Sequence, residues 1–75
     1  DKINFYPNPV NDLLTIQHAK KITSIEIFNL AGLKVKSSLI NTNKETISLA
    51  NLPSGVYIVN AIIEGKNQTF KIVKK

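Results

Sequence analysis

The sequence lacks cysteine, tryptophan and arginine, and each absence excludes a class of chemistry. Without cysteine, the chain has no disulfide and no thiolate metal site. Arginine is the usual bidentate reader of guanine, so its absence argues against nucleic-acid binding despite a net charge of +5. Aromatic residues make up 7% of the chain, and at least two are expected in the core. Few rings are therefore left for base stacking.

Groups able to carry catalysis are also scarce. His18 is the single histidine, and a lone histidine at a strand end is most often a surface residue. The carboxylates lie on different predicted strands and loops, and catalysis by a pair would need two of them in one cleft. They are Asp1, Asp12, Glu26, Glu45 and Glu64. We therefore expect no enzyme activity, no metal site and no cofactor. No stretch reaches the roughly 18 apolar residues that suggest a direct membrane span.

The most informative stretch is Leu52-Pro53-Ser54-Gly55 and the apolar run behind it. Proline in the second place and glycine in the fourth predict a type I turn at residues 52–55. Residues 56–63 are rich in β-branched side chains and predict a central strand. Alternation places two sets of side chains on opposite faces of this strand, with Tyr57 largely buried. The sets are Tyr57, Val59, Ala61 and Ile63, and Val56, Ile58 and Ile62.

Six further runs predict strands at residues 3–6, 12–18, 22–30, 33–39, 45–49 and 68–73. Asn29-Leu30-Ala31-Gly32 repeats the turn chemistry, with asparagine first and glycine last. Seven short strands with regular turn signals indicate an all-β sandwich. The side chains expected inside it are Leu14, Ile16, Ile25, Ile27, Ile47, Leu49, Phe70 and Ile72.

Two features of this sandwich concern its surroundings. Phe28, Val56 and Ile58 form a partner surface if they are exposed, although we favour their being covered by the second sheet or by an upstream domain. Residues 1–75 are interpreted as one domain, and because the chain starts at Asp1 and not at methionine we expect it to come from a longer protein.

Several groups of residues follow one another along the chain in a distinctive order. They are Tyr6-Pro7-Asn8-Pro9, Leu14-Thr15-Ile16, Ile25-Glu26-Ile27-Phe28-Asn29, Gly32 with Val35, Ile47-Ser48-Leu49, Leu52, Gly55, Tyr57 with Val59, and Lys71-Ile72-Val73-Lys74-Lys75. Together these groups cover nearly the whole chain, and their order and spacing are the basis of a family resemblance. The set resembles the type A C-terminal sorting domain of the Por, or type IX, secretion system.

The resemblance implies an immunoglobulin-like antiparallel β-sandwich at the C-terminus of an exported cargo protein. Such a domain is recognised in the periplasm, and the outer-membrane translocon passes the cargo outward with a carrier barrel protein. A sortase-like cysteine protease commonly removes the domain, and the cargo ends on the cell surface or outside the cell. On this interpretation the chain is a sorting signal for its upstream cargo and has no catalytic role.

The resemblance assigns recognition by the translocon to Lys71, Ile72, Val73, Lys74 and Lys75. The other motif residues are given a structural role: Tyr6, Pro7, Asn8, Pro9, Gly32, Leu52, Gly55, Tyr57 and Val59. Few contacts are expected at the chain end, so loss of residues 73–75 is predicted to leave the sandwich folded. The alternative function is a structural or carbohydrate-binding sandwich appended to an extracellular enzyme, although the lack of tryptophan argues against sugar stacking.

Overall fold

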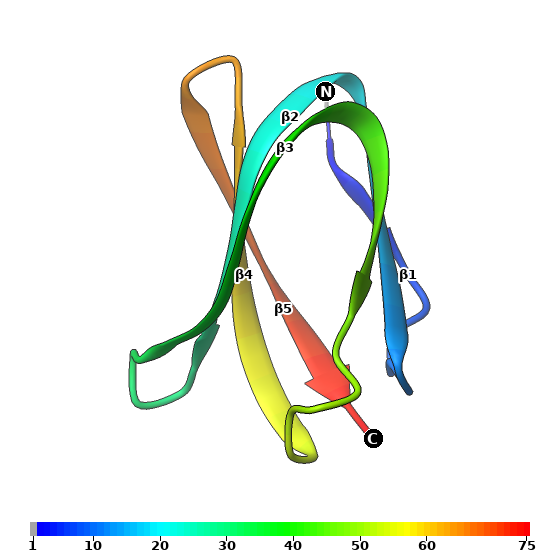
Figure 1. Cartoon of the computed structure of the whole chain (residues 1–75), viewed down its shortest axis with the longest axis vertical. Coiled ribbons are helices and arrows are strands. Elements are labelled where there is room, and N and C mark those ends of the chain that lie inside the picture. The colour runs from blue at the N-terminus through cyan, green and yellow to red at the C-terminus, as the bar shows by residue number, and fades with distance from the viewer. Residues whose placement is uncertain (1) are drawn as a thin grey trace.

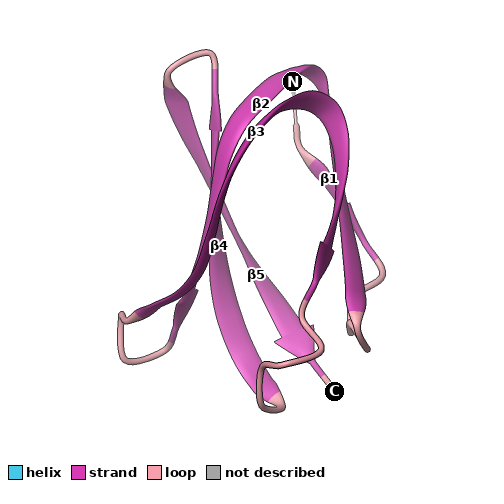
Figure 2. Ribbon diagram, viewed as in Figure 1, coloured by secondary structure: helices cyan, strands magenta, loops and turns pink. Residues whose placement is uncertain are grey.

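The computed structural model describes residues 2–75, which form a single five-stranded β-sheet (Figure 1). The strands are β1 (Asn4–Tyr6), β2 (Leu13–Asn29), β3 (Lys34–Ser48), β4 (Gly55–Ile63) and β5 (Lys66–Lys74). Each of the strand pairs β1–β2, β2–β3, β2–β4 and β4–β5 is antiparallel. Between the strands the described residues form only loops and turns, and no helix able to cross a membrane is found among them (Figure 2). The predicted all-β class is confirmed.

The predicted number of seven strands is not confirmed, because four of the predicted strands are halves of two long ones. Strand β2 joins the predicted strands at residues 12–18 and 22–30, and β3 joins those at residues 33–39 and 45–49. The β2–β3 ladder is interrupted between the pairs Gln17–Lys44 and Ile22–Thr42. There the Asn43 side-chain amide donates hydrogen bonds to the carbonyls of Ala19 (2.8 Å) and His18 (3.3 Å). A side chain thus replaces lost ladder bonds, so the strands bend without ending.

The two long strands fold the sheet over on itself. The first half of β2 pairs with β1 and the second half of β3, whereas its second half pairs with β4 and the first half of β3. Figure 1 shows β2 and β3 arching together from one side of the molecule to the other. The described strands therefore belong to one bent sheet, and the immunoglobulin-like sandwich of seven strands is not confirmed.

The core lies inside this fold and contains most of the side chains predicted to be there. Buried residues among those predicted are Leu14, Ile16, Ile25, Ile27, Ile47, Leu49, Tyr57, Val59, Ala61, Ile63 and Ile72. Phe70 is only half-buried and stacks on Phe5 with ring centroids 4.1 Å apart. The inward positions on β2 change from even to odd numbers across a register shift between Ile22 and Ser24. A β-bulge explains this change, since one extra residue reverses the alternation of the side chains.

Candidate functional site

The end of β5 is held between two neighbouring segments. On one side it pairs with β4, where Lys74 lies opposite Gly55 and Val73 opposite Val56. On the other side Val10 forms a parallel bridge with Lys74. The Val10 N–H donates to the Val73 carbonyl (2.7 Å), and the Lys75 N–H donates to the Val10 carbonyl (2.8 Å). At residues 73–75, both edges of the last strand are therefore occupied by this chain.

The Tyr6-Pro7-Asn8-Pro9 motif leads into this contact. The Asn8 side-chain oxygen accepts a hydrogen bond from the Val73 N–H at 3.0 Å. The Tyr6–Pro7 and Asn8–Pro9 peptide bonds are cis, and Val10 behind them is fully buried. We call residues 8–10 the N-terminal clamp. The clamp joins positions about 65 residues apart in the sequence, a contact that the chain order alone does not indicate.

The side chains of Lys71, Ile72, Val73, Lys74 and Lys75 alternate between the two faces of β5. Ile72 and Lys74 point inward and are buried, Lys74 with 8% of its surface exposed, whereas Lys71, Val73 and Lys75 are exposed. The Lys74 ammonium donates a hydrogen bond to the Lys75 carbonyl at 3.0 Å. The expectation of few contacts at this end was wrong, because Lys74 is buried and the residues on either side of it are bonded to the clamp. The side chains of three of the five residues are therefore accessible at the surface.

An apolar patch lies beside these side chains on the outer face of the sheet. We call Phe28, Val56, Ile58 and Val73 the outer patch. Ile58 pairs with both Phe28 and Lys71, and Val56 pairs with Val73, so the patch spans β2, β4 and β5. Its first three members are half-buried, and no second sheet covers them among the described residues. The expected covering by a second sheet is therefore wrong, whereas covering by an upstream domain stays a prediction.

A row of polar side chains crosses the same face. The Glu26 carboxylate lies 2.8 Å from the Lys34 ammonium. It also accepts a hydrogen bond from the side-chain amide of Asn60 at 3.5 Å. The side-chain oxygen of Asn60 in turn accepts a hydrogen bond from the Thr69 hydroxyl at 3.2 Å. The hydrogen bond with Lys34, and then that with Asn60, holds the pKa of Glu26 below its ordinary value. These bonds pair the Glu26 carboxylate with neighbouring side chains. The row therefore has a structural role.

The predicted turn before β4 is displaced toward the N-terminus. The turn closed by a backbone hydrogen bond spans residues 49–52, with the Leu52 N–H donating to the Leu49 carbonyl (3.0 Å). Gly55 instead begins β4 with a φ of 156°, which residues with side chains rarely adopt. The type I turn predicted at residues 52–55 is therefore not observed. Tyr57 is buried, as predicted, and its hydroxyl donates to the Pro53 carbonyl at 2.6 Å.

The turn at residues 29–32 is confirmed. The Gly32 N–H donates to the Asn29 carbonyl at 3.0 Å, and Gly32 has a φ of 86°. The Asn29 side-chain oxygen accepts from the N–H groups of Ala31 and Leu33. Asparagine and glycine act here as the turn chemistry requires. Gly32 and Leu52 thus lie in turns, Gly55 begins β4, and Tyr57 and Val59 lie in the core.

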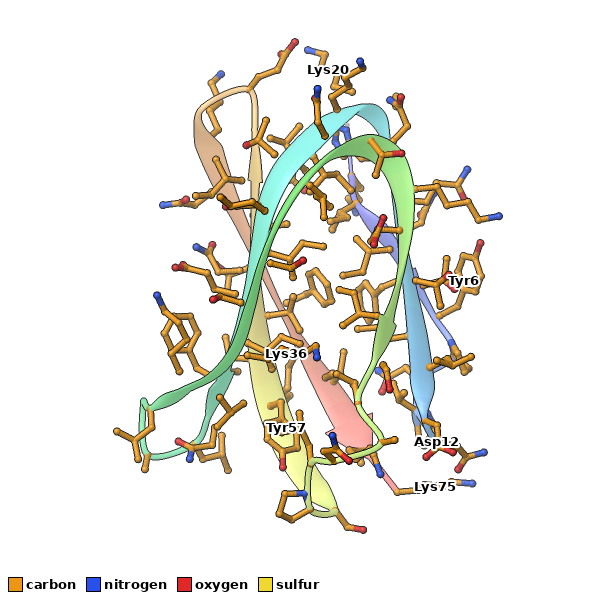
Figure 3. All side chains as sticks on the ribbon, in the orientation of Figure 1. Tyr6, Asp12, Lys20, Lys36, Tyr57 and Lys75 are labelled. Atoms are coloured by element: carbon orange, nitrogen blue, oxygen red, sulfur yellow. The ribbon has the colours of Figure 1, made fainter. Side chains whose placement is uncertain are left out.

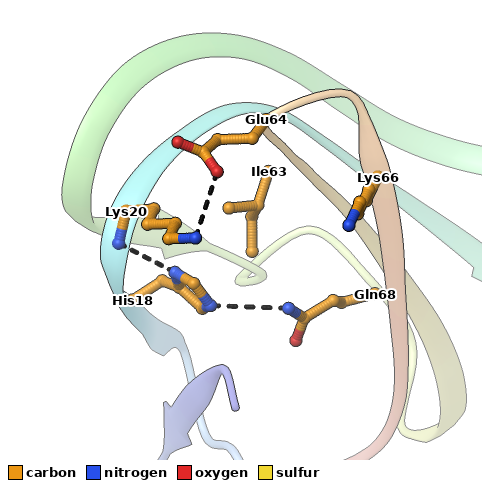
Figure 4. A pocket seen from close by; sticks show the side chains of 6 residues that line it. All are labelled: His18, Lys20, Ile63, Glu64, Lys66 and Gln68. Carbon is orange, nitrogen blue, oxygen red and sulfur yellow. Dashed lines mark hydrogen bonds and ion pairs between the residues drawn. The ribbon is translucent and has the colours of Figure 1, made fainter. Parts of the chain in front are cut away.

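The remaining candidates for chemistry are the single histidine and the acidic side chains. Within residues 2–75, no group of three or more histidine and acidic side chains is placed to hold a metal. Asp1 lies outside the described residues. His18 is not at the surface as expected, because only 4% of it is exposed. It lines a cavity of about 150 Å³ between β2 and the β4–β5 hairpin (Figure 4).

Comparison with known proteins identifies one family. A family model described as a secretion system C-terminal sorting domain matches residues 4–75 of the chain. The match includes all five strands, the N-terminal clamp and the terminal residues of β5. A search of curated proteins finds no match to the chain.

Proposed function

Because the chain belongs to the family of secretion system C-terminal sorting domains, we propose that it is the folded sorting signal of one cargo protein. A domain of this family is a sorting signal and not a catalyst. It acts with the type IX secretion machinery, and its presence implies export to the cell surface or the extracellular space. The match over residues 4–75 is the observation that carries the proposal.

The proposed route requires a cargo domain upstream of residues 1–75. The cargo passes through the periplasm, where the machinery recognises the sorting domain. The outer-membrane translocon and its carrier barrel then move the cargo outward, and a sortase-like cysteine protease removes the domain. A compact sheet without cysteine supports this route, since it cannot form incorrect disulfides in an oxidising compartment.

The translocon recognises the C-terminal strand, residues 71–75, through its outward side chains. Lys71, Val73 and Lys75 are exposed on β5, whereas Ile72 and Lys74 anchor the strand in the core. Addition of a partner strand needs free backbone groups at a sheet edge. At residues 73–75 those groups are bonded to β4 and to the N-terminal clamp. Within residues 73–75, recognition through side chains is therefore favoured over strand addition.

The test replaces the exposed lysines and keeps the fold. A reporter fused to the domain is expressed in a host with the secretion system, with Lys71→Ala and Lys75→Ala combined. The matched control combines Lys36→Ala and Lys44→Ala, which removes the same charge from exposed positions on β3. We expect both proteins to melt like the parent, with only the first retained in the periplasm. Normal export of the first variant would show that these lysines are not recognised.

A further inference from the structure

The turn between β2 and β3 carries two of the three most exposed large apolar side chains among residues 2–75. Leu30 has 71% of its surface exposed and Leu33 has 65%. Single exposed leucines are ordinary on protein surfaces, whereas apolar side chains gathered at one place indicate a contact. The tip of the β2–β3 hairpin is therefore a candidate contact surface.

The register of the sheet extends this tip into a row of apolar side chains. Strand β2 pairs with β4 as far as Asn29 and Tyr57. Extending that register by one residue brings Leu30 next to Val56, and Val56 pairs with Val73 on β5. We call this set the apolar row, and it consists of Leu30, Leu33, Val56 and Val73.

Two further rows follow the apolar row along the outer face of the sheet. In the next row Phe28 and Ile58 are paired at the centre, and a lysine pairs with each of them at the ends, Lys34 on β3 and Lys71 on β5. We call these four residues the basic row. Beyond it lies the polar row described above, which consists of Glu26, Asn60 and Thr69. From the tip inward, the outer face thus changes from apolar to basic to polar.

The segments near the tip carry no charge of their own. Residues 29–33 and 49–59 contain no charged side chain, and Figure 1 shows the β2–β3 turn and the loop before β4 at the same end of the molecule. Lys20 lies at the opposite end (Figure 3). Asp12 and Lys75 lie on the side of the clamp (Figure 3), and their opposite charges cancel. The end of the molecule around the hairpin tip is therefore apolar and uncharged.

The order of the three rows matches the order of layers at a membrane surface, where hydrocarbon is followed by charged headgroups and then by water. Apolar side chains at such a surface enter the boundary of the acyl chains, while lysines extend to the headgroups. Lys34 is paired with Glu26, whereas no ion pair of Lys71 is found among the described residues, so an anionic headgroup would supply its partner. The net charge of +5 adds attraction to an anionic surface at longer range. A stable protein partner requires roughly 800 Å² from each side, and a projecting hairpin turn is too narrow for that.

We propose that the hairpin tip docks this chain on a membrane surface that contains anionic lipids. Leu30 and Leu33 enter the boundary between headgroups and acyl chains, and Lys71 contacts a lipid phosphate. The chain lies on the bilayer and does not span it. The inference goes beyond the proposed export function and does not depend on it, because binding to lipid concerns the chain alone.

The test is co-sedimentation of the 75-residue chain with lipid vesicles. One set of vesicles contains phosphatidylcholine and phosphatidylglycerol, and the other contains phosphatidylcholine alone. We expect saturable binding to the anionic vesicles that weakens with added salt, which screens the charges, and much weaker binding to the neutral ones. Absence of binding to the anionic vesicles overturns the proposal.

Substitutions of exposed leucines test whether the tip makes the contact. Leu30→Ser combined with Leu33→Ser should weaken binding at least about tenfold, because two apolar side chains no longer leave water. Leu39→Ser is the matched control, since Leu39 is 90% exposed on β3 and pairs with Ser24, away from the tip. It should bind like the parent. Equal weakening by the control, or no weakening by the pair, overturns the assignment to the tip.

The basic row is tested with a pair of variants that remove the same charge. Lys71→Gln should weaken binding about fivefold, the factor for one lysine close to an anionic surface. Lys66→Gln, at an exposed position in the hairpin at the opposite end, should change it much less. Equal weakening by both would mean that only net charge matters, which overturns the orientation.

A second copy of the chain is the other occupant that the tip could contact. Sedimentation velocity without lipid measures the oligomeric state of the parent and of the variant with Leu30→Ser and Leu33→Ser. We expect both to be monomers. A dimer of the parent that the variant does not form would assign the tip to contact between copies and overturn the proposal.

Discussion

Tyr57 connects the loop before β4 to the core (Figure 3). Its ring is buried with 5% of its surface exposed, and its hydroxyl reaches the carbonyl of Pro53 four residues earlier at 2.6 Å. The ring contributes hydrophobic burial, and the hydroxyl holds the segment 49–55 against the sheet. One side chain therefore has two separable contributions to stability.

The two contributions predict different costs for two substitutions. Tyr57→Phe keeps the ring and loses the hydrogen bond, so unfolding should become easier by about 1 kcal/mol. Tyr57→Ala also loses the ring and should cost about 3–5 kcal/mol. Chemical denaturation followed by far-UV circular dichroism measures both values. If the alanine variant lost no more than the phenylalanine variant, the ring would not be part of the core.

Glu26 makes stability depend on acidic pH with a definite sign. Its pKa is lowered by Lys34 and Asn60, so the ionised carboxylate stabilises the fold above the ordinary glutamate pKa. That contribution is lost as the pH falls through the lowered value. Lys34→Gln should therefore reduce the loss of stability in acid, as measured by unfolding free energies across a pH series. Lys36→Gln is the control, and the two variants should differ in pH dependence.

At the scale of elements, the N-terminal clamp determines how the last strand is held. Asn8→Ala removes the acceptor of the Val73 N–H and should cost about 1 kcal/mol or slightly more. Hydrogen exchange at the Val73 amide should accelerate more than the change in global stability explains. Asn11→Ala, at an exposed position in the same connection, is the control. Unchanged protection of Val73 would contradict the role of the clamp.

Strand β3 has an edge without a partner strand among the described residues. Among the described strands it pairs only with β2, so its outer edge faces solvent along its whole length. Lys34, Lys36 and Lys44 lie along this edge, and its ladder is irregular near Phe28 and Thr42. Lysines and bulges are the usual means by which edge strands avoid pairing with other chains. The lysine excess of the sequence thus has a structural use at this edge.

For the whole molecule, the folded-over sheet makes both halves depend on one another. Strands β2 and β3 run through both halves, and the clamp joins residues 8–10 to residues 73–75. Deleting residues 73–75 removes the three clamp bonds, each contributing about 0.5–1.5 kcal/mol. We therefore expect a loss of about 2–4 kcal/mol and a lower melting temperature.

A truncated chain that melts like the parent would restore the original expectation of a dispensable end. The matched control is Lys75→Ala, which changes the same end and keeps the backbone that bonds to Val10. It should melt like the parent. The comparison also determines how export data are interpreted, since a truncation that unfolds the domain cannot separate recognition from folding.

The sequence by itself determined the all-β class, the core faces of the strands and the turn at Asn29–Gly32. These are local properties, because alternation has a period of two and turn chemistry lies within four residues. Only the tertiary structure decided that residues 13–29 and 34–48 are continuous, since Asn43 must bond to carbonyls 24 and 25 residues away. It also decided that Lys74 and His18 are buried, since Lys74 is bridged to Val10 and His18 faces residues of the β4–β5 hairpin, all far away in the sequence. Contacts between distant residues leave no periodic signal in the chain, and for that reason they appear only in the fold.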